Sequence, residues 1–201
     1  MQLHKKLLIA ALACTAPFLA HAESTFVTGT TGSTTAHVDF TIVIPRILFL
    51  QVGTGTSLAN NTAVNLITFT VPAANVGDTS VISGTGGDLS GGVVTAKVIG
   101  NNGNVTLTSS TAGALNDGAG DTVSWSQITT TAATNTSATA LAAPALADTG
   151  TPSVTLTATN KVVNQDAKWT YKYLNANVVA NGTYGGVNTN NGRVTYTASM
   201  P

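Results

Sequence analysis

Hydrophobic and polar residues alternate over one short stretch near the start of the chain, residues 36–44. Ala36, Val38, Phe40, Ile42 and Ile44 share one parity, and the residues between them are mostly polar. Period-two alternation is typical of a strand with one buried face. We therefore expect these five residues to line the first strand of the protein's own sheet. Pairing of the same strand with a neighbouring molecule is the alternative.

Pro45 interrupts this pattern, and a second apolar strand is expected over residues 47–52. Proline cannot donate a hydrogen bond to a sheet, so it breaks or bends the run at that point. The whole stretch of residues 36–53 also contains Asp39 and Arg46. It is too short and too interrupted to span a bilayer, which excludes a membrane anchor here.

Further short strands follow, separated by turn residues. They are expected at residues 64–71, 81–82, 93–99, 104–109, 123–128, 153–158, 167–174 and 192–199. The link "GNNGN" between the third and fourth of these contains Asn-Gly, a dipeptide that favours a tight reversal, so it predicts a hairpin. In the segment "AKWTYKYL", Ala167, Trp169, Tyr171 and Tyr173 share one face, which predicts a core strand.

No stretch has a convincing helical period. The Thr/Ala-rich residues 129–153 contain Pro144 and Pro152, which oppose a helix, so they predict a long loop attached to the body by Leu141 and Leu146. Many short strands with turns between them are typical of an all-β fold. We predict an immunoglobulin-like Greek-key β-sandwich.

The first residues have the organisation of a secretory signal. Lys5 and Lys6 precede an apolar stretch, and Ala20-His21-Ala22 forms a small-x-small cleavage site. This pattern predicts export, with cleavage after Ala22; lipidation at Cys14 is the alternative. The expected organisation is a signal peptide over residues 1–22, a flexible Thr/Gly-rich lead over 23–35 and a single sandwich domain over 36–201.

Removal of the signal changes the chemistry that remains. The chain loses its only cysteine and two of its three histidines, which excludes disulfides and zinc sites built on cysteine or several histidines. Six basic residues then face eight acidic ones, a net charge of −2. A chain without a basic patch is unsuited to nucleic acid, so we expect no such partner.

Three groups of residues are candidate chemical sites. The turn "NDGAGD" offers Asn116, Asp117 and Asp121 to calcium, although Asp-Gly is also an ordinary turn pair, and we expect plain turn chemistry and no resident cofactor. His37 and Asp39 share a strand face, and a distant serine would complete a hydrolase triad with them. We interpret this pair instead as part of a solvated face.

Aromatic residues offer the remaining candidate. Trp125 stands alone in a polar strand and is one candidate for stacking on a sugar. The row formed by Trp169, Tyr171 and Tyr173 alternates with lysines, which favours core packing over a glycan-binding face.

The two ends of the chain carry recognisable motifs. The ending "NGTYGGVNTNNGRVTYTASMP" combines a Gly-Thr-Tyr turn with an alternating last strand, and "DFTIVIP" ends the first strand in Ile-Pro. These motifs resemble secreted bacterial immunoglobulin-like sandwiches of the spore-coat-U/pilin and WxL types. The whole chain is also similar to uncharacterised secreted bacterial proteins with an "IPR" first strand and a "GTYGG…GRVTYTASMP" end.

The pilin-type resemblance implies assembly by donor-strand complementation, in which a strand of one subunit fills a groove in the next. The chain departs from these families because its mature part has no cysteine and its tryptophans lie in "WSQ" and "WTY". The sequence therefore predicts an exported, non-enzymatic structural or surface-associated protein, such as a filament, coat or biofilm-matrix component, with itself or another surface protein as its partner. A carbohydrate-binding or adhesive module with a glycan partner is the alternative function, followed by a secreted hydrolase.

Overall fold

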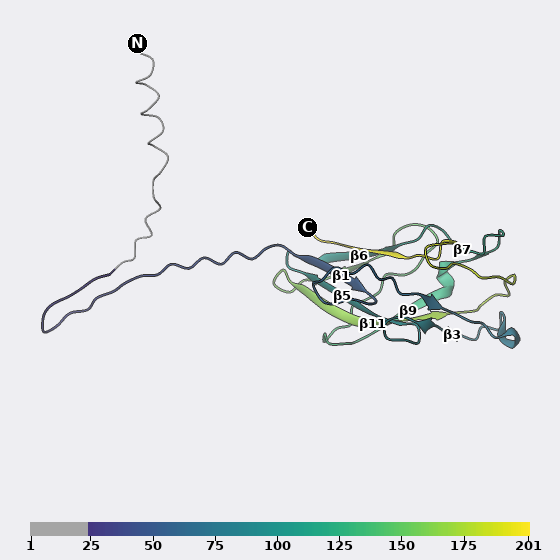
Figure 1. Cartoon of the computed structure of the whole chain (residues 1–201), viewed down its shortest axis with the longest axis horizontal. Helices are drawn as coiled ribbons and strands as arrows, with labels where there is room; N and C mark the ends of the chain where they lie inside the picture. The colour runs from purple at the N-terminus through teal and green to yellow at the C-terminus, as the bar shows by residue number, and fades with distance from the viewer. Residues whose placement is uncertain (1–23) are drawn as a thin grey trace, which may run out of the picture. The chain divides into compact units, whose positions relative to one another are not determined.

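The computed structural model describes residues 24–201, and the chain divides into two units, Met1–Ile44 and Pro45–Pro201. The predicted signal sequence, its cleavage site after Ala22 and Cys14 lie outside the described residues. Within the first unit, residues 24–44 form no helix or strand, and we call them the arm. The second unit contains every strand of the described chain (Figure 1).

The larger sheet of the second unit is antiparallel and five-stranded. Its long central strand β11 pairs with β5, β3 and β9. At one edge of the sheet, β1 pairs with β5. The bounds of these strands are β1 Leu48–Val52, β3 Ile82–Ser83, β5 Val93–Gly100, β9 Ile128–Ala133 and β11 Val163–Tyr173.

The second sheet has three antiparallel strands with β6 in the middle, between β10 and β12. Two small strand pairs and two single 3-10 turns lie in the connections. The bounds are β6 Val105–Ser110, β10 Ser153–Leu156, β12 Thr195–Ser199, the pairs β2 Ile67–Thr68 with β4 Thr85–Gly86 and β7 Leu115–Asn116 with β8 Thr122–Val123, and the turns η1 Ala73–Asn75 and η2 Trp125–Gln127.

The two sheets enclose one hydrophobic core. Alternate residues of β5, β6 and β11 point inward and are buried, as their period-two patterns predict. Trp169 of β11 lies with its ring centroid 5.3 Å from that of Tyr196 on β12, so the layers are in direct contact. The all-β sandwich class is confirmed, and the immunoglobulin-like Greek-key order of connections stays a prediction.

A pair of tyrosine hydroxyls also joins the sheets. The Tyr171 and Tyr196 hydroxyl oxygens are 2.9 Å apart and share a hydrogen bond. Burial raises the pKa of Tyr196 to about 12 and also raises the pKa of Tyr171. Both phenols therefore stay neutral over the ordinary pH range and satisfy each other inside the core.

The loop between β9 and β10 forms one wall of the core. Its Leu141, Pro144 and Leu146 are buried, which confirms the predicted attachment through the two leucines. The Trp169 indole N–H donates to the Leu141 carbonyl at 2.7 Å, and the Ser109 hydroxyl donates to the Ala145 carbonyl at 2.6 Å. The predicted loop is shorter than expected, because β9 takes its first residues.

Asp166 holds the start of this loop on the outer face of β11. One carboxylate oxygen accepts the backbone N–H groups of Thr136 and Ser137 at 2.9 and 2.8 Å, and both hydroxyls of these residues also contact the carboxylate. Desolvation by burial raises the pKa of Asp166, but these hydrogen bonds together lower it by more. The pKa of Asp166 therefore lies well below its usual range.

The prediction of a strand over residues 36–44 is wrong in this structure, and the sandwich unit begins at Pro45 instead of residue 36. The reason lies in the neighbouring strand, because β5 ends at Gly100 and the chain then leaves the sheet. The Asn101 side chain closes the ladder by accepting from the Ile47 N–H at 2.8 Å and donating to the Pro45 carbonyl at 2.8 Å. The β1–β5 ladder therefore ends at this point, inside the second unit.

The predicted hairpin between residues 93–99 and 104–109 is also wrong, although both strands exist. β5 belongs to the larger sheet and β6 to the smaller one, so the link crosses between layers instead of reversing within one. Gly103, with φ +108°, supplies the reversal that Asn-Gly favours. β5 pairs with β11 in one sheet, and β6 pairs with β10 and β12 in the other. The local turn does not encode these long-range pairings.

Replacement of Asp166 by Asn tests its role in holding the loop. Because hydrogen bonds to a charged group are lost, we expect the free energy of unfolding to fall by about 2 kcal/mol near neutral pH. A carboxyl whose folded pKa is depressed stabilises above its unfolded pKa, about 4, and this stability is lost as pH falls toward the folded value. The difference in the free energy of unfolding between wild type and variant should therefore become smaller below about pH 4.

Urea denaturation across a pH series measures this gap, and Asp121→Asn is the matched control because Asp121 is exposed. A gap that stays constant down to about pH 2 would contradict the role assigned to the ionised carboxylate.

Candidate functional site

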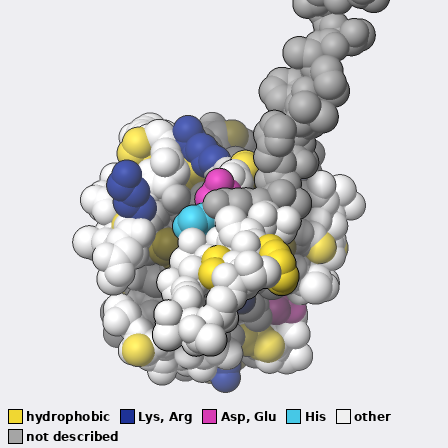
Figure 2. All heavy atoms as spheres, turned by 90° about the vertical axis from the view of Figure 1, so that its left-hand side faces the viewer, with side chains coloured by type: hydrophobic (Ala, Val, Ile, Leu, Met, Phe, Trp, Pro, Cys, Tyr) yellow, Lys and Arg dark blue, Asp and Glu magenta, His cyan; other side chains and the backbone are white. Residues whose placement is uncertain are grey.

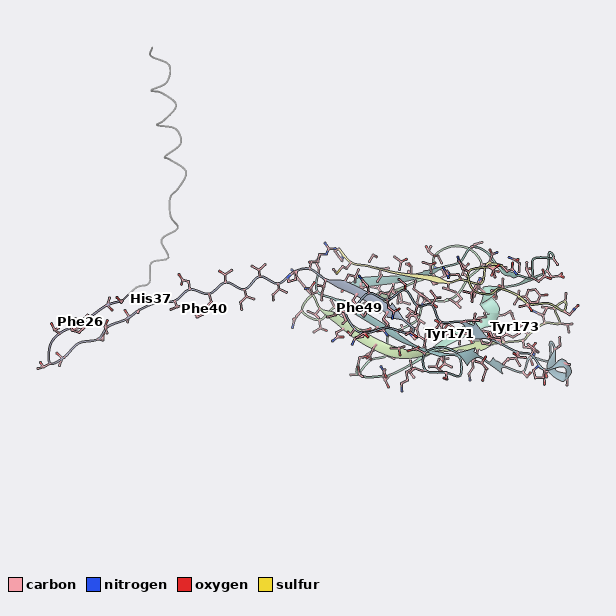
Figure 3. The ribbon with its side chains drawn as sticks, in the orientation of Figure 1. Phe26, His37, Phe40, Phe49, Tyr171 and Tyr173 are labelled. Carbon is pink, nitrogen blue, oxygen red and sulfur yellow. The ribbon has the colours of Figure 1, made fainter. Side chains whose placement is uncertain are left out.

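The apolar face of residues 36–44 is the candidate site that differs most from its expected setting. Its large side chains are almost fully exposed: Val38 75%, Phe40 87%, Ile42 84% and Ile44 76%, and Val43 on the other parity is 86% exposed. Figure 3 shows the backbone here as an extended run with the Phe40 ring pointing away from the chain. We call residues 36–44 the apolar segment.

Exposure of this kind is unusual because single apolar side chains are tolerated on a surface, whereas contiguous ones mark interaction sites. Burial of each Val, Ile or Phe side chain would contribute about 1.5–3 kcal/mol. An extended backbone also presents N–H and C=O groups that another strand can pair with. The apolar segment is therefore suited to adding itself to a sheet.

The remainder of the arm has a different character. In residues 24–35 the Thr25 hydroxyl donates to the Thr35 carbonyl at 2.8 Å, and the Thr34 hydroxyl donates to the Thr25 carbonyl at 3.1 Å. These bonds close a small Thr/Gly-rich loop that contains Phe26 and Val27 as its only large apolar residues. The apolar surface of the arm is thus concentrated in the apolar segment.

His37 and Asp39 lie on the polar parity of the same segment, and both are exposed. Neither lines either of the hollows described below. A hydrolase triad needs its base beside a nucleophile and a substrate cavity. The structure gives this pair no enclosed setting of that kind.

Trp125 is a core residue, so the expectation that it stands on the surface for stacking is wrong. The residue is 5% exposed, and its indole N–H donates to the Gly113 carbonyl at 2.9 Å. The predicted strand over residues 123–128 is broken here because the Ser124 hydroxyl accepts the Ser126 N–H at 3.2 Å and caps the turn η2. The turn directs the indole inward.

The aromatic row of β11 has the environment that its alternation predicts. Trp169, Tyr171 and Tyr173 are buried, while Lys168 and Lys172 are exposed. These rings pack between the sheets and present no face on which a sugar could stack.

The acidic turn before β8 is held by hydrogen bonds from its backbone N–H groups to its own side-chain oxygens. One carboxylate oxygen of Asp117 accepts the backbone N–H groups of Ala119, Gly120 and Asp121 at 2.8, 3.1 and 3.1 Å, and the Asn116 side chain accepts from Gly118. The bond from Ala119, followed by those from Asp121 and Gly120, lowers the pKa of Asp117. These are the hydrogen bonds that an ordinary Asp-Gly turn makes. Among residues 24–201, no three His, Cys, Asp or Glu residues converge as a metal site.

Two hollows lie along β1 and were not predicted from the sequence. The larger, about 420 Å³, is lined by Arg46–Phe49 together with Leu58 and Asn60, and the smaller, about 90 Å³, lies between residues 49–52 and 54–63. Their linings come from a strand and from the loop that follows it. Sequence alternation indicates which residues of a strand face inward, but not whether a neighbour covers its edge.

The surface offers little charge. Figure 2 shows a face made mostly of uncharged polar side chains and backbone, on which Lys and Arg side chains are separated from one another. In the part of the chain that the structure describes, no helix is long and apolar enough to cross a membrane. No family model, curated protein or solved structure matches the chain.

Replacement of Trp125 by Ala distinguishes a core role from a ligand-binding one. Because a buried indole and its hydrogen bond are removed, we expect the free energy of unfolding to fall by about 3–5 kcal/mol. Chemical denaturation measures this change, with Ser126→Ala on the exposed side of the same turn as the control. Unchanged stability combined with lost glycan binding would show instead that Trp125 is a stacking residue.

Proposed function

We propose that the chain is an exported, non-enzymatic structural protein that associates with copies of itself through the apolar segment. The observation that carries the proposal is the exposure of Val38, Phe40, Ile42 and Ile44 in one extended, alternating run. An extended peptide that adds to a sheet gains main-chain hydrogen bonds, and its alternate side chains enter the hydrophobic interior. The apolar segment has both requirements.

The rest of the chain supports a structural role. The surface is weakly charged and rich in Thr and Asn, which favours association over mutual repulsion. The signal-like residues 1–22 support export, so filaments, coats or a matrix outside the cell are the assemblies that this proposal includes.

The arm supplies the test. We expect the chain from Glu23 to Pro201 to form oligomers or filaments as its concentration rises, and the double variant Phe40→Asp/Ile42→Asp to stay monomeric. Buried carboxylates without partners cost several kcal/mol each, so they would prevent insertion of the segment. Size-exclusion chromatography and negative-stain imaging measure the outcome.

Thr41→Asp is the matched control because it adds the same charge on the polar parity of the segment. It should leave assembly largely intact, and circular dichroism should show the same β structure in all three proteins. A wild-type chain that remains monomeric at high concentration would refute self-association.

A further inference from the structure

β1 is an edge strand whose outer side has no partner. It pairs with β5 alone among the strands of the described chain. The Gly53 N–H donates to Thr95 at 2.7 Å, and the Asn101 N–H donates to Ile47 at 3.4 Å. In an antiparallel pair such bonds alternate, so the odd-numbered residues of β1 face β5. The N–H and C=O groups of Leu48, Leu50 and Val52 therefore point to the free edge.

The side chains of the same three residues leave the core incompletely covered. They share a face with buried residues of β5, because Leu50 lies opposite Val98 and Val52 opposite Ala96. Val98 is 0% exposed, whereas Leu48 is 38% exposed and the other two are half-buried. The hydrophobic interior thus reaches solvent along β1.

The loop after β1 passes this edge without pairing with it. Within the described chain, residues 54–63 make no backbone hydrogen bond to β1, and all of them are exposed. The loop is held by side chains instead: Gln51 donates to the Gly53 and Gly55 carbonyls at 2.9 and 3.3 Å, and Asn65 binds Thr54. The 420 Å³ hollow between Arg46–Phe49 and Leu58 shows that this loop does not fill the edge.

The other edge of the larger sheet, β9, is less suited to receive an apolar partner. β9, at the opposite end of the larger sheet, consists of the residues "ITTTAA", and its threonines offer little apolar surface. β1, in contrast, combines unpaired backbone groups, half-covered leucine and valine side chains and an adjacent hollow.

The backbone of Pro45–Ile47 opposes a hairpin between the apolar segment and β1 of the same copy. A hairpin that paired Ile44 with Leu48 would require a reversal at Pro45–Ile47. Those three residues show no turn or bend, and Asn101 holds them in line with β1 through the Pro45 carbonyl and the Ile47 N–H. The segment of a second copy has no such constraint.

We infer that the free edge of β1 is the acceptor for the apolar segment of a second copy of this chain. The incoming strand would pair with the N–H and C=O groups of Leu48, Leu50 and Val52. Its row containing Val38, Phe40 and Ile42 would then lie beside their side chains on the core face of the sheet. The loop of residues 54–63 would be displaced outward. This inference rests on the proposed self-association and adds the partner surface.

Cross-linking between two preparations of the Glu23–Pro201 chain, which has no cysteine, tests the inference. Donor proteins carry Val38→Cys, Phe40→Cys or Ile42→Cys, and the acceptor carries Leu48→Cys. Residues opposite one another on adjacent strands have the separation that a disulfide needs, so at least one donor should give about tenfold more heterodimer than with Thr131→Cys on β9. The donor Thr41→Cys, on the polar parity, is the second control.

Each outcome bears on a different claim. Reduced samples that form oligomers, but whose donors link to Leu48→Cys no better than to Thr131→Cys, would overturn the β1 acceptor and leave self-association standing. A further variant carries Phe40→Cys and Leu48→Cys in one chain. Monomers of it that are closed by an intramolecular disulfide would overturn the requirement for a second copy. A chain that neither oligomerises nor cross-links would refute both claims. If Leu48→Cys fails to fold, Val52→Cys on the same row of β1 takes its place with the same expectations.

Discussion

Backbone hydrogen bonding between β11 and β5 is the interaction on which the rest of the structure depends. It aligns eight residues of each strand and places Trp169, Ala167 and Ala96 in the middle of the core. Each further strand of the larger sheet is added to this pair, and β1 is the last on its side. The same requirement for a partner that builds the sheet is left unmet at the outer edge of β1.

The core is covered by a loop at one side and left partly open beside β1. The loop of residues 134–152 inserts Leu141 and Leu146 between the layers, and Asp166 and Trp169 hold it by hydrogen bonds. Beside β1, the corresponding space is a hollow flanked by an exposed loop. The apolar segment carries the apolar side chains that such an edge lacks. We propose that the open edge of β1 and the exposed apolar segment are the two complementary halves of one interface between copies.

Alternation in the sequence predicted the parts of the fold that local pattern determines. It gave the inward face of β11 and the half-buried Tyr196 and Ala198 of β12 correctly, because a strand that borders one core must alternate. It failed where distant partners decide the outcome. The Asn-Gly link joins two sheets instead of two neighbouring strands. Ser124 turns the chain at Trp125. The Asn101 side chain ends the β1–β5 ladder at Pro45–Ile47, so the ladder does not include residues 36–44. The hollow beside β1 depends on a loop position that no periodicity encodes.

Hydrogen exchange at the amides of β1 tests the central claim most directly. In monomeric protein the N–H groups of Leu48, Leu50 and Val52 face the free edge and should exchange quickly, whereas those of Phe49 and Gln51 face β5 and should be protected. In assembled protein all five should be protected, because an added strand supplies the missing acceptors. Assemblies in which the three even-numbered amides remain as fast as in the monomer would contradict the account.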